Sequence, residues 1–195
     1  MPINPAGALS QYRTQSDANE AAIAVLDTQV SGIVVGETEI FRAVSNVDQS
    51  PSGLDTPLQV TFGSGQSTTE FNLDALGELT VLVSGYYTLT LRLVFGRTGN
   101  PGTANLYARG LVNGTQSLAS IFTKLDDANT SVSSLFTASG YFPASTTFTA
   151  EIMRASINSG IDAGGLHAEP SPLAGWLAAP SCSIAITRNN VILGS

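Results

Sequence analysis

Side chains that carry nucleophilic or metal chemistry are scarce in this chain. It has one histidine, His167, and one cysteine, Cys182. A hydrolase triad is disfavoured because the sequence has no Gly-x-Ser-x-Gly nucleophile turn. One histidine and one cysteine do not make a four-ligand zinc site by themselves. Cys182 lies in an apolar, strand-like run, which favours a small buried thiol over a nucleophile. We therefore expect no catalytic residue, no cofactor and no metal.

Two polar segments have residue types found in ion-binding loops, but neither has the required spacing. Asp126, Asp127 and Asn129 offer the oxygen ligands that calcium prefers, yet they do not match an EF-hand loop. A solvated turn is the better interpretation of this segment. The glycine-rich run 63–65 lacks the lysine of a phosphate-binding loop.

The acidic residues are dispersed along the chain. Glu70, Glu78 and Glu151 all lie in segments with strand-like patterning. Glycoside hydrolysis needs two carboxyl groups flanking the scissile bond, and the order of strands in a sheet can bring distant residues together. A glycan hydrolase or depolymerase acting on a cell-surface polysaccharide therefore stays open as the enzymatic alternative. A reducing-sugar assay with such a polysaccharide would decide it.

The composition favours a β protein with neutral polar surfaces. Of 195 residues, 43% are hydrophobic and only 12% are charged, against about 25% charged in ordinary soluble domains. The net charge is −7, and the single lysine and the arginines form no cluster, which disfavours direct nucleic-acid binding. We also expect no membrane span and no secretory signal, and hence synthesis in a cytoplasm.

The segment from Glu78 to Arg97 has the longest clean alternation in the chain. Its apolar, core-facing side is expected to consist of Leu89, Leu91, Leu93 and Phe95. The opposite face is mostly polar, as in a strand that is half buried. The Ser84–Gly85 pair interrupts the alternation and predicts a bend or bulge with a strand on each side. A strand with one apolar face requires a second layer to cover it.

The remaining strands are short and are separated by turn signals. They are expected at 39–47, 58–62, 68–73, 104–112, 116–122, 132–142, 146–155 and 181–188. The Asn113–Gly114 pair is the strongest hairpin signal because both residues tolerate a positive φ. About nine such strands, without helices between them, predict an all-β, antiparallel jelly-roll-like β-sandwich over residues 36–195.

The first 35 residues are expected to form an extended arm and one short helix. Residues 1–15 contain Pro2 and Pro5 and show little periodicity. Residues 17–30 read as a helix with a narrow apolar stripe. That stripe consists of Ile23, Leu26 and Val30. The arm is either disordered or laid against a neighbour, and the helix packs either on its own domain or against symmetry mates.

Residues 158–180 form the unusual segment of the chain. It is rich in Gly, Ala and Pro, and it contains His167 and the only tryptophan, Trp176. Long loops in compact domains are usually functional or disordered. Its apolar side chains argue against plain disorder and predict that it lies on a protein surface; whether it binds a ligand stays open.

Four short motifs occur in an order that resembles tumour-necrosis-factor/C1q-like (TNF/C1q-like) jelly rolls. They are Ser84–Leu89 (S-G-x-Y), Leu111–Gly114 (V-N-G), Ser139–Ala144 followed by Phe148–Ala150, and Ser183–Thr187. The resemblance covers about residues 68–190. It implies a TNF/C1q-like fold and a homotrimer. With an arm and helix in front, the chain is similar to bacteriophage virion proteins of the cement or fibre-head type. The long loop before the last strand departs from the family, so no receptor-contact residue is carried over.

The resemblance implies a phage capsid cement (decoration) protein on the outer surface of the head, binding the major capsid protein and bridging capsomers. The alternative is the receptor-binding head of a tail or head fibre, which would bind host glycan. Three chains would carry three times −7, or −21, which suits the capsid exterior. Candidate partner-binding residues are Ile3, Tyr12, Ile23, Leu26, Val30, Tyr86, Tyr107, His167 and Trp176, with Tyr87 and Tyr141 as further trimer-interface candidates because tyrosine is enriched at interfaces. Ordinary core burial is the alternative for the four tyrosines at 86, 87, 107 and 141.

Overall fold

The structure is a computed structural model that describes residues 18–21, 40–97, 103–117, 119–126, 131–156, 164–171 and 173–189. The chain divides into two compact units, residues 1–37 with 190–195, and Thr38–Asn189. In the first unit, residues 18–21 are helical and fall inside the helix predicted for 17–30. The candidate contact residues Ile3, Tyr12, Ile23, Leu26 and Val30 lie outside the described residues. Among the described residues, no helix has the length and apolar character needed to cross a membrane.

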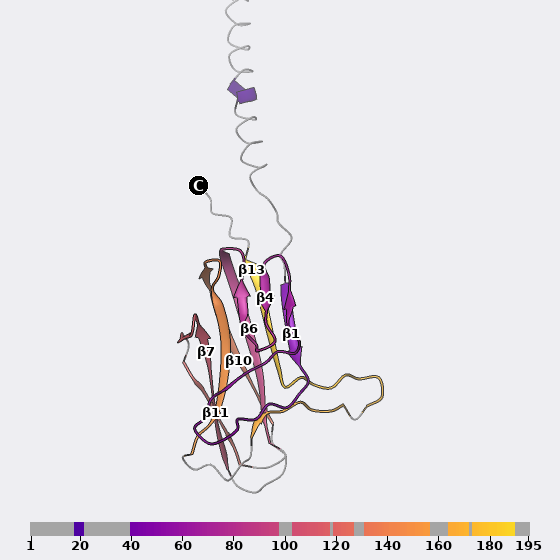
Figure 1. The fold of residues 1–195 in the computed structure, drawn as a ribbon. Coiled ribbons are helices and arrows are strands. Elements are labelled where there is room, and N and C mark those ends of the chain that lie inside the picture. The colour runs from indigo at the N-terminus through magenta and orange to yellow at the C-terminus, as the bar shows by residue number, and fades with distance from the viewer. Residues whose placement is uncertain are drawn as a thin grey trace, which may run out of the picture. The chain divides into compact units, whose positions relative to one another are not determined.

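The unit Thr38–Asn189 consists of two antiparallel sheets (Figure 1). Sheet A has the order β1 (Ile40–Ser45), β13 (Cys182–Asn189), β6 (Gly85–Gly96) and β10 (Val132–Phe142), and β12 (Gly165–Leu166) also pairs with β6. Sheet B has the order β3 (Gln66–Ser67), β4 (Phe71–Leu73), β5 (Leu79–Val81), β11 (Thr147–Arg154), β7 (Ala104–Val112) and β8 (Thr115–Gln116). In addition, β2 (Leu58–Gln59) pairs with β11, and β9 (Ile121–Leu125) pairs with β7.

The strand pairing is nested in the manner of a jelly roll. The first strand pairs with the last, β1 with β13, and inside that pair β5 lies beside β11, β6 beside β10, and β7 beside β9. Such nesting is what results when one long antiparallel hairpin is wrapped around a common core. The prediction of an all-β antiparallel jelly-roll sandwich is therefore confirmed.

The Ser84–Gly85 interruption marks a change of sheet. β5 ends at Val81 in sheet B, and β6 begins at Gly85 in sheet A, so the chain crosses the sandwich between them. This confirms a strand on each side of the interruption, but the break is larger than the bend or bulge expected. A side chain from one half of this segment therefore faces the other half across the core.

The core fills the space between the inner faces of the two sheets. Leu91, Leu93 and Phe95 of β6 are buried, as their alternation predicts, and Leu89 is partly buried against them. Sheet B contributes Phe71, Leu79, Leu106, Phe148 and Ile152, and sheet A also contributes Phe41, Ile184 and Ile186. Burying each large apolar side chain contributes about 1.5–3 kcal/mol relative to leaving it exposed.

Tyr87 belongs to this core, so of its two alternatives the structure shows core burial and not a place in a trimer interface. Its side chain has no exposed surface, and its hydroxyl donates a hydrogen bond to the Val83 carbonyl oxygen at 2.5 Å. The ring packs edge-on against Phe71 at 5.5 Å between ring centroids. A buried tyrosine needs a partner for its hydroxyl, and the carbonyl before β6 is that partner.

The Asn113–Gly114 hairpin is confirmed. Both residues have positive φ, 50° and 73°, and the flanking pair is Val112 opposite Thr115. This is a two-residue loop whose twist matches that of the strands. The strand expected at 116–122 differs, because it is divided into β8 and β9. Both pair with β7, and their registers differ by two residues, so the ladder with β7 is interrupted between them.

The strands expected at 58–62 and 68–73 are shorter than predicted and are not partners. β2 pairs with β11, and β4 pairs with β3 and β5. Residues 68–70 form a turn in which the Thr68 hydroxyl oxygen accepts a hydrogen bond from the Phe71 amide at 3.1 Å. Side-chain capping of this kind competes with strand pairing at threonine.

Candidate partner-binding surfaces

Residues 169–171 and 173–179, which we call the finger, leave the sandwich between β12 and β13 (Figure 1). Two backbone hydrogen bonds close the base, from the Glu169 amide to the Ala179 carbonyl at 3.1 Å and back at 2.9 Å. At the tip, the Trp176 amide donates to the Leu173 carbonyl at 3.2 Å, and Gly175 has a φ of +84°. A bonded four-residue turn with a positive φ at its third residue is a type II turn, which requires glycine there.

The finger carries the two most exposed large apolar side chains among the described residues, Leu177 and Trp176, together with exposed Leu173. Leu173 is 59% exposed, Trp176 is 72% exposed and Leu177 is 93% exposed. Leaving such side chains in water costs free energy, and adjacent exposed apolar groups mark sites of protein interaction. The backbone bonds at base and tip hold them in place before a partner arrives. Partner binding by Trp176 stays a prediction.

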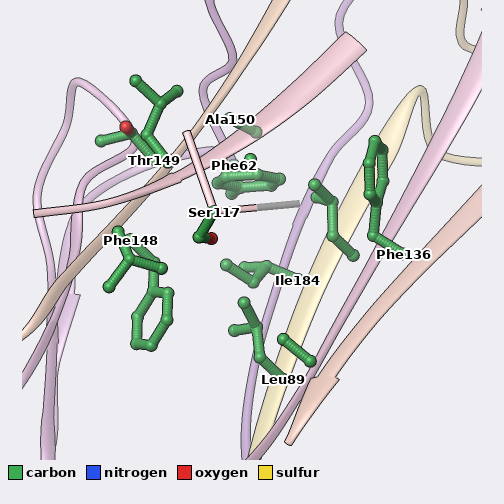
Figure 2. A pocket seen from close by; sticks show the side chains of 13 residues that line it. Phe62, Leu89, Ser117, Phe136, Phe148, Thr149, Ala150 and Ile184 are labelled. Atoms are coloured by element: carbon green, nitrogen blue, oxygen red, sulfur yellow. The ribbon is translucent and has the colours of Figure 1, made fainter. Parts of the chain in front are cut away.

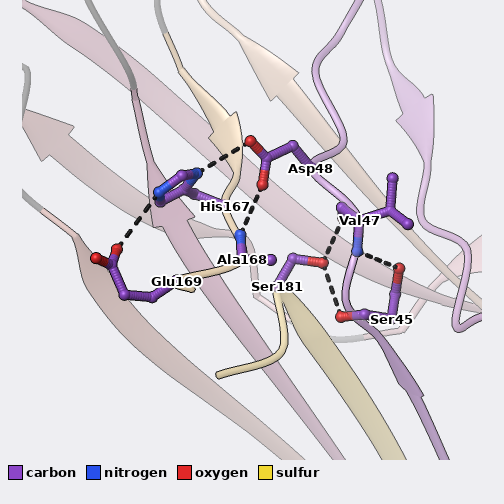
Figure 3. A network of polar contacts seen from close by, with 7 residues as sticks. All are labelled: Ser45, Val47, Asp48, His167, Ala168, Glu169 and Ser181. Atoms are coloured by element: carbon purple, nitrogen blue, oxygen red, sulfur yellow. Dashed lines mark hydrogen bonds and ion pairs between the residues drawn. The ribbon is translucent and has the colours of Figure 1, made fainter. Parts of the chain in front are cut away.

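His167 lies at the base of the finger between two carboxylates (Figure 3). Its Nδ1 is 3.1 Å from Asp48 Oδ2, and its Nε2 is 3.4 Å from Glu169 Oε2. The other oxygen of Asp48 accepts a hydrogen bond from the Ala168 amide at 2.7 Å. Asp48 thus ties the loop after β1 to the base of the finger, which gives His167 an anchoring role. No sequence signal identifies Asp48, because it is 119 residues away from His167.

The same region brings a serine, a histidine and an aspartate together without making a catalytic triad. The Ser181 hydroxyl donates to the Val47 carbonyl at 2.7 Å and lies 3.1 Å from the Ser45 carbonyl (Figure 3). Both contacts are to backbone oxygens, which do not accept a proton in nucleophilic catalysis. A triad needs the hydroxyl hydrogen-bonded to the imidazole, so this arrangement is structural.

The outer face of sheet A is a second surface, and it is almost free of charge. Its outward positions are Ile40, Arg42 and Val44 on β1, Ser183, Ala185, Thr187 and Asn189 on β13, Tyr86, Thr88, Thr90, Arg92 and Val94 on β6, and Ser133, Leu135, Thr137, Ser139 and Tyr141 on β10. Two arginines are the only charged residues in this set. Tyr86 and Tyr141 are both exposed and meet edge-on, with ring centroids 5.3 Å apart. Small neutral side chains around exposed apolar ones suit close contact with another protein.

Val94 is the exception on that face, because it is buried. Its amide donates to the Ser181 carbonyl at 2.9 Å, and its carbonyl accepts from the His167 amide at 2.9 Å. The segment that leads into the finger therefore covers the end of β6.

The outer face of sheet B holds Tyr107, on the opposite side of the sandwich from Tyr86. Its ring lies 5.0 Å from that of Phe122, and both are exposed. Beside them, Arg109 and Glu151 form an ion pair with 2.6 Å between Nη2 and Oε2. A groove of about 170 Å³ runs over this pair. Of the four candidates that the structure describes, only His167 and Trp176 share one region.

An apolar cavity lies between the sheets (Figure 2). Phe62, Leu89, Phe136, Phe148 and Ile184 line it, with Ser117 beside them. The space open to the centre of a water-sized sphere is about 30 Å³. That is room for a water molecule, and the apolar lining gives water few partners. It is a packing defect of the core rather than a substrate site.

Two further acidic residues considered as chemical candidates, Asp126 and Glu70, have structural partners. Asp126 pairs with Lys124 at 2.9 Å, and the hydrogen bond from Lys124 lowers the pKa of its carboxyl group. Glu70 pairs with Arg188 at 2.6 Å. Asp127 and Asn129 lie outside the described residues, and within the described part of the chain no group of three or more His, Cys, Asp or Glu side chains could hold a metal ion.

Cys182 is buried, as expected. Burial raises the pKa of its thiol to about 11, so the reactive thiolate is disfavoured at neutral pH.

No family model matches the sequence, and no curated protein matches it. Among solved structures, the chain is similar to crystal structures of murine APRIL at pH 8.0 and pH 8.5. Both are 13% identical to it, and each alignment covers 78% of this chain and 100% of the APRIL chain. The TM-scores are 0.46 and 0.45, and we draw no functional conclusion from this likeness.

Proposed function

We propose that this protein is a non-catalytic binding protein of a phage particle: a capsid cement protein that attaches as a homotrimer to the outside of the head and bridges capsomers. The observation that carries the proposal is the finger, which presents Leu173, Trp176 and Leu177 to solvent on a backbone closed by hydrogen bonds. A side chain that is exposed on a fixed support loses little conformational entropy when a partner covers it.

The finger provides enough apolar surface for attachment when several copies act together. Burying a tryptophan and two leucines completely contributes about 1.5–3 kcal/mol for each side chain before the cost of association. One finger therefore supports only weak binding. Three fingers on one trimer would bind far more tightly, because the second and third contacts form at a high effective concentration.

The outer face of sheet A supports self-association. Its exposed residues Ile40, Val44, Leu135, Tyr86 and Tyr141 lie among short neutral side chains. Desolvation of charged groups is the usual obstacle to burying a polar protein surface. Covering this face with a second copy desolvates few charges, so that cost is small. The finger remains available for the coat protein if this face is used between copies.

The charge of the chain favours the capsid exterior in this proposal. At −7 for each chain, a trimer at −21 is repelled by packaged DNA. Together with the finger and the outer face of sheet A, this gives the proposed partners: a second and third copy of the chain, and the major capsid protein.

The test is retention on particles of full-length protein with Trp176→Ala and Leu177→Ala. We expect the double variant to wash off the heads and the heads to lose heat resistance. Leu76→Ala is the matched control, because Leu76 is 70% exposed on the turn between β4 and β5, away from the finger in sequence. Heads that keep the double variant and stay heat resistant would refute attachment through the finger. Deleting residues 1–30 tests the arm separately.

The receptor-binding head of a fibre is the second candidate, and a different feature favours it. The groove on the outer face of sheet B combines exposed aromatic rings with an ordered ion pair, which is unlike the apolar finger. Binding of the purified protein to host cells, together with full heat resistance of heads that lack it, would favour this role over cement.

A further inference from the structure

The groove on the outer face of sheet B has a built polar floor. Arg109 on β7 lies directly opposite Glu151 on β11 in the antiparallel ladder. Both Nε and Nη2 of Arg109 approach Glu151 Oε2, at 2.7 Å and 2.6 Å. Because the sheet sets the register, the two groups are held in place before any ligand binds.

The ion pair remains partly open to solvent. The side chains of Arg109 and Glu151 are 41% and 23% exposed. Both short contacts use the same carboxylate oxygen, so Oε1 of Glu151 takes part in neither of them. A guanidinium and a carboxylate side by side offer donors and acceptors at fixed spacing, which matches vicinal hydroxyl groups.

One wall of the groove is aromatic. Tyr107 lines it, and Phe122 packs against Tyr107 with 5.0 Å between ring centroids. Gln116 and Ser120 lie on the same rim, with Gln116 Nε2 donating to Ser120 Oγ at 3.2 Å. Polar groups that converge beside an apolar wall are the usual composition of a small-molecule site.

We infer that this groove binds a neutral pyranose unit of a glycan. A pyranose ring has an apolar face of C–H groups, which stacks on Tyr107, and equatorial hydroxyls at its edge, which reach the Arg109–Glu151 pair. The ligand is neutral because Glu151 offsets the charge of Arg109 and the whole chain is at −7. The same charge disfavours nucleotides, whose bases also stack on aromatic rings.

This inference deepens the fibre-head alternative by naming the ligand class, and it does not depend on the cement role. The test is saturation-transfer difference NMR on the full-length protein. The probes are glucose, galactose, mannose and N-acetylglucosamine at millimolar concentration, with a heparin oligosaccharide as the anionic comparison. We expect saturation transfer to at least one neutral sugar, strongest at the C–H protons of one ring face.

Two tyrosine variants make the test specific to the groove. Tyr107→Ala is expected to weaken binding of the same sugar at least about tenfold, and Tyr107→Phe, which keeps the ring, to retain it. Tyr86→Ala is the control, because Tyr86 is similarly exposed, 41% against 37%, on the opposite face. Transfer to none of the neutral sugars, or equal transfer in the wild type and Tyr107→Ala, would overturn the inference.

The cement role is read out separately by retention of the Tyr107→Ala protein on heads. Its loss from heads, together with equal sugar signals for the wild type and Tyr107→Ala, would assign the groove to the coat protein and overturn the glycan site. Its retention, with sugar binding lost, supports a glycan site that acts independently of attachment.

Discussion

His167 lies directly on Gly96, so closely that a Cβ at position 96 would be 2.6 Å from the His167 Cβ. This contact joins the base of the finger to the end of β6. Position 96 therefore needs a glycine for close approach, although its backbone is that of an ordinary strand.

Gly96→Ala is expected to lower the free energy of unfolding by about 1–3 kcal/mol, because the added methyl group must displace the His167 side chain, beginning at its Cβ. Urea unfolding measures this, and hydrogen exchange of the His167 amide reports release of the segment from Val94. Gly140→Ala in β10 is the control, because its Cβ would have 3.8 Å to the nearest atom. Equal stability of the two variants would contradict the contact.

The Asn113–Gly114 turn predicts a second glycine effect with a different cause. A Cβ at Gly114 would have no atom within 4 Å, so Gly114→Ala is strained only through its φ of +73°. We expect a loss of about 1 kcal/mol in the free energy of unfolding. Gly114→Asn is expected to cost less, since asparagine tolerates this conformation better. A larger loss for Gly114→Asn than for Gly114→Ala would refute the turn assignment.

The thiol of Cys182 predicts a pH dependence at the alkaline end. Burial raises its pKa to about 11, whereas an unfolded thiol ionises near about 8.5–9. Between these values the unfolded chain releases a proton that the folded chain keeps, so the free energy of unfolding falls as pH rises. The contribution is complete below about pH 8.5 and is lost as the pH rises through about 11.

Comparison with Cys182→Ala isolates this effect from tyrosine and lysine titration. The wild type is expected to lose up to about 3 kcal/mol more than the variant between neutral pH and pH 11. Denaturant unfolding at several pH values measures the difference. Curves that run parallel across the whole range would show that the thiol is not buried in solution.

The outer face of sheet A predicts the state of assembly. Val44 and Leu135 lie in one row across the sheet, joined through Ser183 and Arg92. Changing both to lysine places two charges on that face, and we expect the proposed trimer to dissociate because burying them is costly. Light scattering should then give the single-chain mass of 20.2 kDa.

Leu76→Lys serves as the control for that experiment, because it adds a charge at an exposed leucine on the turn between β4 and β5. Its mass should equal that of the wild type. A wild-type chain that is already monomeric at micromolar concentration would count decisively against the proposed homotrimer.

Local patterns predicted most of the strands because their causes are local. The alternation from Leu89 to Phe95 reflects the two-residue period of a strand, and the turn at Asn113 follows from the conformational freedom of two residues. Burial of Cys182 follows from its apolar neighbours in β13. In each case the physical requirement is met within a few residues, so the sequence carries the information.

Partner choice across the sandwich was decided only by tertiary structure. The alternation identifies Tyr87 as a strand residue, but it does not say whether its side chain faces the core or the outside. In the structure the side chain is buried, with its hydroxyl bonded to Val83 and its ring packed against Phe71. Asp48 meets His167, and Arg109 meets Glu151, across separations of 119 and 42 residues. The sequence by itself determined a β-sandwich with an apolar loop before its last strand. The nesting of the strands decided which side chains share a face, because pairing between distant strands depends on the packing of the whole core.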